Sequence, residues 1–181
     1  MPTPFEPGGQ IHSTDPFAVA QSDRSPVRQF RGRLTAPVTL WTAYRVQPTA
    51  EPAGLTVSSI LVADGEPGRL LGLIDPESDL WTAVSASGRF TVAVLGPQHE
   101  QLADQFAGLM PAPGGPFQGY TWQPTGYGPL LDGVDTWAGC TVDASRPYGW
   151  GRLVEATIVA VSIGSGAAPT LAHLRGRYHS Q

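Results

Sequence analysis

The sequence contains no lysine, and all 11 of its basic residues are arginine. A phosphate-binding loop of the G-x-x-x-x-G-K-[ST] type and a lysine Schiff base are therefore both excluded. Cysteine is almost as scarce, because Cys140 is the only one and no internal disulfide can form. The apolar run around Cys140 predicts a buried small side chain and not a catalytic thiol.

Charge is also scarce, at 14% of residues against about 25% in an average soluble domain. The net charge of −4 argues against broad nucleic-acid binding. No apolar run approaches the roughly 18 residues of a membrane span, and the N-terminus lacks the pattern of a secretory signal. We therefore expect a cytoplasmic protein that binds neither nucleic acid nor membrane. The histidines have no zinc-ligand spacing, so no metal site is expected.

The chain is rich in turn formers, with 22 glycines and 18 prolines. Residues 1–22 combine Pro, Gly, Ser and Asp without periodicity, which predicts a mobile arm. Residues 23–181 then form one domain.

Most of this domain has the composition of short strands. Helices are expected only at residues 25–34, 78–87 and 98–106. Residues 89–95 alternate polar and apolar side chains, which predicts a strand covered on one face. Because no regular βαβ alternation is present, an antiparallel barrel is favoured over a parallel sheet. The expected strands are residues 38–44, 54–62, 69–74, 89–95, 120–122, 129–131, 135–142, 152–163 and 171–178.

Residues 54–59 (GLTVSS) carry an unusual density of hydroxyl groups for an apolar strand. Buried hydroxyls need hydrogen-bond partners. Two interpretations follow from the residues alone. The hydroxyls form cross-strand hydrogen bonds, or they face a polar ligand.

The order of short motifs from about residue 25 to 181 resembles the flavin-reductase family. Members of that family share an FMN-binding, mainly β, antiparallel split β-barrel with a few short helices. Residues 85–95 (SASGRFTVAVL) are similar to the family's SGRFAVNVL junction, and residues 54–59 are similar to its flavin-binding strand. The other similar segments are RQF at 28–30 with Arg33, residues 38–43, LA at 102–103, QFAG at 105–108, LLDG at 130–133, Trp137 with Cys140, and RGRY at 175–178.

The resemblance implies a flavin site in three parts. The hydroxyl-rich strand would contact the isoalloxazine edge and the ribityl chain. The loop at 74–80 would hold the flavin phosphate, partly through a helix N-terminus, and one aromatic ring would border the ligand. No catalytic side chain is expected, because the flavin performs the electronic work. The implied cofactor-binding residues are Thr56, Val57, Ser58, Ser59, Ile74, Asp75, Ser78, Leu80 and Phe106.

The implied activity is hydride transfer from NADH or NADPH to N5 of FMN or FAD. Reduced flavin would then leave and serve a partner monooxygenase. Family members are typically homodimers, with each flavin site near the subunit interface.

Two segments depart from the family pattern. The phosphate loop reads DPESDL at 75–80, so Leu80 stands in place of a threonine and three carboxylates crowd the loop. Carboxylates repel a phosphate. The segment after Cys140 lacks the family's Gly-Asp-His turn, whose histidine serves the nicotinamide site. Arg146, Tyr148 and Trp150 are the substitute candidates there, unless both aromatic rings pack the end of the barrel.

These departures leave two other functions open. The chain could be a flavin-binding protein that has lost nicotinamide-dependent activity. It could also be a split barrel that binds no flavin.

Overall fold

The computed structural model describes residues 25–45, 51–166 and 168–181. The arm expected at residues 1–22 lies outside the described residues. Within the described ranges, no helix is long and apolar enough to span a membrane.

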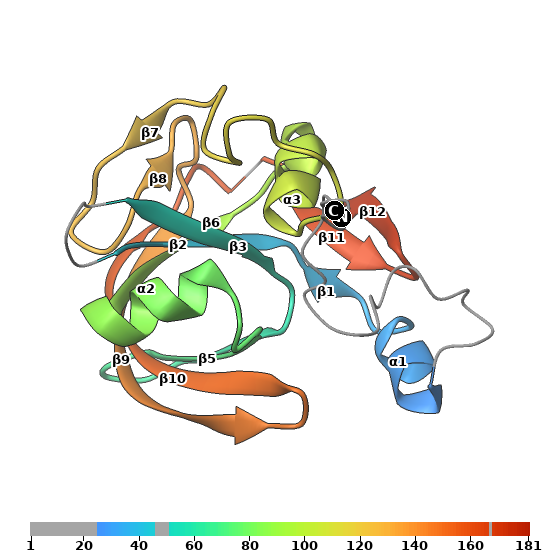
Figure 1. Cartoon of the computed structure of the whole chain (residues 1–181), viewed down its shortest axis with the longest axis horizontal. Coiled ribbons are helices and arrows are strands. Elements are labelled where there is room, and N and C mark those ends of the chain that lie inside the picture. Colours follow the sequence, from blue (N-terminus) through green and yellow to red (C-terminus); the bar gives the residue numbers. More distant parts are fainter. Residues whose placement is uncertain (1–24, 46–50, 167) are drawn as a thin grey trace, which may run out of the picture.

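A single antiparallel sheet of seven strands forms most of the molecule, in the order β3-β2-β6-β9-β10-β5-β4. The sheet curls on itself, and α2 lies on its concave side (Figure 1). This architecture confirms the expected mainly β, antiparallel split barrel with few helices. The strands are Thr39–Tyr44 (β2), Pro52–Val57 (β3), Ile60–Ala63 (β4), Arg69–Ile74 (β5), Arg89–Val94 (β6), Trp137–Tyr148 (β9) and Gly151–Ser162 (β10).

Smaller elements surround this sheet. One small sheet contains Ala36–Pro37 (β1), Leu171–Leu174 (β11) and Arg177–Ser180 (β12). The other contains Trp122–Gln123 (β7) and Leu130–Leu131 (β8). The helices are Pro26–Arg31 (α1), Asp79–Ser87 (α2) and Glu100–Phe106 (α3), the last preceded by a 3₁₀ turn at Pro97–His99.

The helix α2 has the caps that the sequence predicts. The Ser78 side chain accepts a hydrogen bond from the Trp81 amide at 3.1 Å, which satisfies a free N–H of the first turn. Gly88 ends the helix with φ 67°, a left-handed conformation that favours glycine. Leu80, Ala83 and Val84 are buried and fix α2 against the sheet.

The strand β6 is covered on both faces, so the expectation of one covered face is wrong. Phe90 and Val92 belong to the core between the sheet and α2, where the Phe90 ring stacks on Trp41 at 4.6 Å. Ala93 points into a second core beside α3. Thr91 is buried as well, and its hydroxyl donates to the carbonyl of Gly128 at 3.1 Å. Because threonine is polar, the sequence pattern indicated that Thr91 faces solvent. In the structure a loop covers this side chain.

The strand expected at residues 54–62 is two strands, β3 and β4, separated at Ser58 and Ser59. The chain leaves β3 at one edge of the sheet and enters β4 at the other edge. A hydrogen bond from the Leu73 amide to the Ser59 carbonyl, at 2.9 Å, connects the crossing to β5. The split of the barrel therefore lies at the hydroxyl-rich segment.

Three other boundaries differ from expectation. Residues 171–178 are a hairpin and not one strand, with Arg175 and Gly176 at positive φ in the turn. The strand expected to end at 142 continues to Tyr148 because it pairs with β10 along most of its length. The first helix ends at Arg31, and Val27, Phe30 and Leu34 are exposed.

Candidate functional site

The crossing from β3 to β4 presents free hydroxyl groups. Thr56 donates its hydroxyl to the Ala103 carbonyl of α3 at 2.7 Å, so this group anchors a helix and does not pair across strands. In the described part of the chain, neither Ser58 nor Ser59 makes a side-chain hydrogen bond. Because β3 is an edge strand, it also has backbone groups that no neighbouring strand pairs. The two serines and this edge can therefore serve a polar ligand.

The loop at residues 75–78 is internally hydrogen-bonded. The Glu77 amide donates to Asp75 Oδ1 at 2.8 Å, and the Ser78 hydroxyl donates to the Asp75 carbonyl at 2.7 Å. Ser78 also caps α2, so its hydroxyl is already engaged on both sides. The loop therefore offers a ligand a fixed backbone and not a free serine.

Four of the expected flavin-binding side chains belong to the core. Val57, Ile74, Leu80 and Phe106 are each no more than 3% exposed. The Phe106 ring packs edge-on against Phe117 at 4.9 Å. These residues can meet a ligand mainly through their backbone, and Leu80 fills the core where a threonine was expected to face the phosphate.

Two arginines that the sequence analysis did not single out flank the first turn of α2. Arg45 forms an ion pair with Asp79 at 2.5 Å, which balances one of the three loop carboxylates. The guanidinium of Arg152 lies over the Trp81 ring, 4.9 Å from its centroid. Both arginines have a buried Nε without a hydrogen-bond partner. Strand register, which the sequence does not reveal, places Arg152 opposite Ile74.

The strand pairing brings these segments together. Arg152 pairs with Ile74 in the β10–β5 ladder, and the neighbouring Leu73 bonds to Ser59. The Ser58–Ser59 crossing, the loop after β5 and the start of β10 are thus adjacent, although they are far apart in the sequence.

The tip of the β9–β10 hairpin is open to solvent. Trp150 is 92% exposed and Tyr148 is 56% exposed, so the interpretation in which both rings pack the barrel end is wrong. The Arg146 guanidinium lies 5.2 Å from the Tyr148 ring centroid and 3.7 Å from the Glu155 carboxylate. Gly151, next to the tip, approaches Leu73 so closely that a Cβ would lie 2.9 Å from that side chain.

Among the described residues, neither Cys140 nor His99 provides a nucleophile or an acid–base group for this site. Cys140 is buried in the core, and burial raises the pKa of its thiol to about 12. His99 is partly buried, and its Nδ1 accepts a hydrogen bond from the Gly96 amide at 3.1 Å. Burial lowers the pKa of His99, and its hydrogen bond serves the turn before α3.

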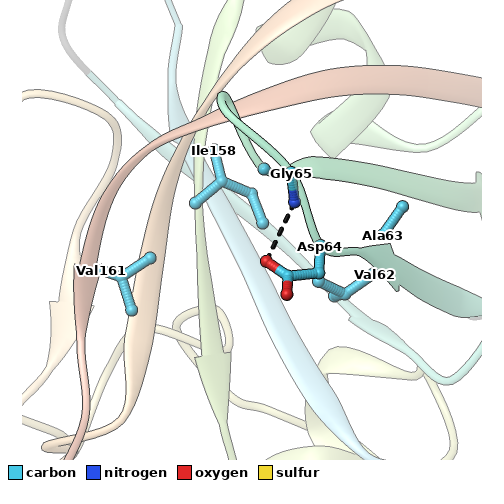
Figure 2. Close-up of a pocket in the computed structure, with 7 residues that line it drawn as sticks. Val62, Ala63, Asp64, Gly65, Ile158 and Val161 are labelled. Carbon is cyan, nitrogen blue, oxygen red and sulfur yellow. Dashed lines mark hydrogen bonds between the residues drawn. The ribbon is translucent and has the colours of Figure 1, made fainter.

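A hollow of about 500 Å³ lies away from this site. It is at the end of β5 and β10 that is farther from Ile74 and Arg152. Figure 2 shows residues that line it, among them Val62, Asp64, Ile158 and Val161. This hollow is mainly apolar and does not include the expected flavin-binding residues.

Comparisons with known proteins identify relatives of this chain. A relative from Variovorax paradoxus, the FMN reductase (NADH) RutF, is 28% identical over 157 residues, covering 86% of this chain and 84% of its own. The reductase subunit HsaB of a flavin-dependent monooxygenase from Mycobacterium tuberculosis is 27% identical over 161 residues, covering 88% and 83%.

Solved structures match most of this chain. Nitrilotriacetate monooxygenase component B from Mycobacterium thermoresistibile aligns with a TM-score of 0.74 and 26% identity, over 86% of each chain. The Streptomyces globisporus NADH:FAD oxidoreductase SgcE6, solved with NAD and FAD fragments, aligns with a TM-score of 0.75 and 21% identity, over 89% of this chain and 94% of its own. The family model described as "Flavin reductase like domain" matches residues 31–181. This chain therefore belongs to the flavin reductase family.

Proposed function

We propose that this chain is an NAD(P)H-dependent flavin reductase that supplies reduced FMN or FAD to a partner monooxygenase. The observation that carries the proposal is the juxtaposition of two unpaired serine hydroxyls, at Ser58 and Ser59, with an arginine-flanked helix start. The relatives named as an NADH-dependent FMN reductase and as a monooxygenase reductase subunit support the same activity.

The residues at the site fit a flavin. An isoalloxazine edge and a ribityl chain need hydrogen-bond partners, which Ser58, Ser59 and the free edge of β3 can provide. The flavin phosphate would meet the backbone of residues 74–80 and the start of α2, as we proposed from the sequence. Val57, Leu80 and Phe106 would support this surface from the core behind it.

A bound flavin would supply the redox chemistry, because it accepts a hydride from a reduced nicotinamide. This chain's residues would bind and orient the two partners. Arg146, Tyr148 and Trp150 are our candidates for the nicotinamide side, since an exposed ring can stack and an arginine can meet a phosphate.

We also propose that the chain works as a cytoplasmic homodimer, with residues 23–181 as its single domain. Six large apolar side chains are exposed on or beside β4, β5 and β10, which is typical of a protein interface. They are Leu61, Val62, Leu71, Val159, Val161 and Ile163.

The test is a flavin titration followed by an oxidation assay on the same sample. We expect quenching of tryptophan fluorescence by FMN or FAD, and then NADH or NADPH oxidation that depends on added flavin. No turnover with either nucleotide and either flavin would contradict the reductase.

One observation favours a second candidate function. The hairpin tip, residues 149–151, contains no histidine, and its aromatic ring at Trp150 is exposed. Tight flavin binding without nicotinamide oxidation would therefore identify a flavin-binding protein that has lost the reductase step. A protein that binds no flavin would exclude both functions.

A further inference from the structure

The described residues contain two buried side-chain nitrogen atoms without a hydrogen-bond partner, and both are arginine Nε atoms beside α2. They belong to Arg45 and Arg152. A buried donor that lacks an acceptor is costly, so nearly all such groups in folded proteins are paired with protein, water or a ligand. Two such donors beside one helix start indicate a place where an acceptor binds.

Arg152 is the stronger candidate for binding an anion, because it has no counter-ion in the described part of the chain. Arg45 is paired with Asp79 at 2.5 Å. The carboxylate nearest to Arg152 along β10 is Glu155, which faces Arg146 at 3.7 Å. The positive charge of Arg152 is therefore not balanced by an ion pair.

The position of Arg152 is fixed by its neighbours. Its guanidinium lies over the Trp81 ring at 4.9 Å, a geometry in which the ring attracts the cation. Its backbone is fixed opposite Ile74 by the β10–β5 ladder. A stacked guanidinium keeps its N–H groups at the ring's edge, where they can form a fork-like pair of hydrogen bonds to a planar or tetrahedral anion.

The carboxylates of the loop do not occupy this position. Asp75 Oδ1 accepts from the Glu77 amide at 2.8 Å, and Asp79 is neutralised by Arg45. The loop carboxylates therefore repel a phosphate less strongly than the sequence alone indicates. Two of the three, Asp75 and Asp79, already interact with neighbouring groups of the chain.

We propose that Arg152, positioned by Trp81, binds a phosphate group of a nucleotide cofactor at the start of α2. This inference rests on the proposed function, since that function places a nucleotide here. The phosphate could belong to the flavin or to the dinucleotide co-substrate. Both share the same anionic chemistry, and the experiment separates them.

The first arm of the experiment measures flavin affinity by fluorescence titration for FMN and for riboflavin, which lacks the phosphate. In Arg152→Gln we expect the Kd for FMN to rise roughly ten- to a hundredfold, the usual effect of losing a charge-assisted hydrogen bond. The Kd for riboflavin should stay unchanged, which also shows that the variant is folded. Arg152→Lys should recover part of the FMN affinity.

The second arm measures the KM for NADH and for reduced nicotinamide riboside, which has no phosphate. If the dinucleotide provides the anion, Arg152→Gln raises the KM for NADH alone and leaves FMN affinity unchanged. Arg89→Gln is the matched control, because Arg89 is an exposed arginine of the same sheet that lies outside the site, and it should change neither quantity.

Trp81 is a positioning residue in this proposal. Trp81→Leu should reproduce part of the Arg152→Gln effect on the phosphate-bearing ligand, whereas Trp81→Phe, which keeps an aromatic face, should recover it. If Arg152→Gln changes neither the FMN affinity nor the KM for NADH, the proposed role of Arg152 is wrong, while the proposed function of the chain still stands. A wild-type protein that binds neither riboflavin nor FMN would overturn the proposed function as well.

Discussion

Cys140 lies in the core of the barrel, where its side chain has no exposed surface. Burial disfavours the thiolate and raises the pKa of the thiol from 9.0 to about 12. We expect native protein to resist a thiol-specific reagent such as dithionitrobenzoate, and unfolded protein to react with one equivalent. Fast reaction of the native protein would contradict this burial.

The same pKa shift has a consequence for stability. The thiol of Cys140 ionises more easily in the unfolded chain, so the shift lowers the unfolding free energy as pH rises above 9.0 toward about 12. Below pH 9.0 the thiol is protonated in both the folded and the unfolded chain, so its effect on the unfolding free energy does not vary with pH. Denaturant titrations of the wild type and Cys140→Ala should show a steeper alkaline loss of stability in the wild type.

Gly72 gives a third prediction at the scale of one residue. A Cβ at this position would overlap the Trp41 ring, which is held by its stack on Phe90. Gly72→Ala should therefore destabilise the fold by about 1–3 kcal/mol, as overpacking does. Gly126→Ala is the matched control, because its Cβ would meet no atom within 4 Å. Equal melting temperatures for the two variants would contradict the close packing at Trp41.

At the scale of the element, α2 depends on its N-cap. Ser78→Ala removes the side-chain acceptor for the Trp81 amide and should cost about 1 kcal/mol of stability. Ser85→Ala is the matched control, because Ser85 lies on the exposed face of the same helix and alanine is a better helix former. Thermal unfolding of both variants tests this, and a larger loss for Ser85→Ala would argue against the cap.

The β9–β10 hairpin tip should matter for function and not for stability. Trp150 is 92% exposed, so Trp150→Ser should leave the melting temperature nearly unchanged. If the ring stacks on the nicotinamide, the KM for NADH should rise severalfold while flavin affinity is kept. Phe30→Ser, which changes an exposed ring on α1, is the control. Identical kinetics for all three proteins would remove Trp150 from the nicotinamide site.

The elements that could be predicted from the sequence are those with local signals. Ser78 and Gly88 mark the ends of α2, and the strand β5 matches its expected residues 69–74. The break at Ser58 has no local signal, because it arises where the chain crosses between two edges of the sheet. Arg152 was missed for a related reason, since its place beside the loop after β5 depends on its pairing with Ile74, a long-range register.

At the scale of the whole molecule, the apolar surface of β4, β5 and β10 requires an explanation. Leu61 and Leu71 are opposite each other in the β4–β5 ladder and are 58% and 37% exposed. Val161, which is 58% exposed, lines the hollow shown in Figure 2 together with Val62. Val62 pairs with the buried Leu70, so it lies on the opposite face of the ladder from Leu61 and Leu71. Exposed apolar side chains gathered in one region are typical of a protein interface, and a second copy of the chain would cover the outward pair Leu61 and Leu71 symmetrically.

A dimer built on this surface makes a specific prediction. Light scattering should give the wild type twice the mass of one chain, and Leu61→Glu or Leu71→Glu should give a single-chain mass, because a buried unpaired carboxylate opposes association. Leu109→Glu, which changes an exposed leucine outside this surface, should remain dimeric. If each flavin site lies near the interface, the monomeric variants should also bind FMN more weakly while keeping their native circular dichroism. A wild-type monomer with full flavin affinity would show that this surface serves another partner and that the site is complete within one chain.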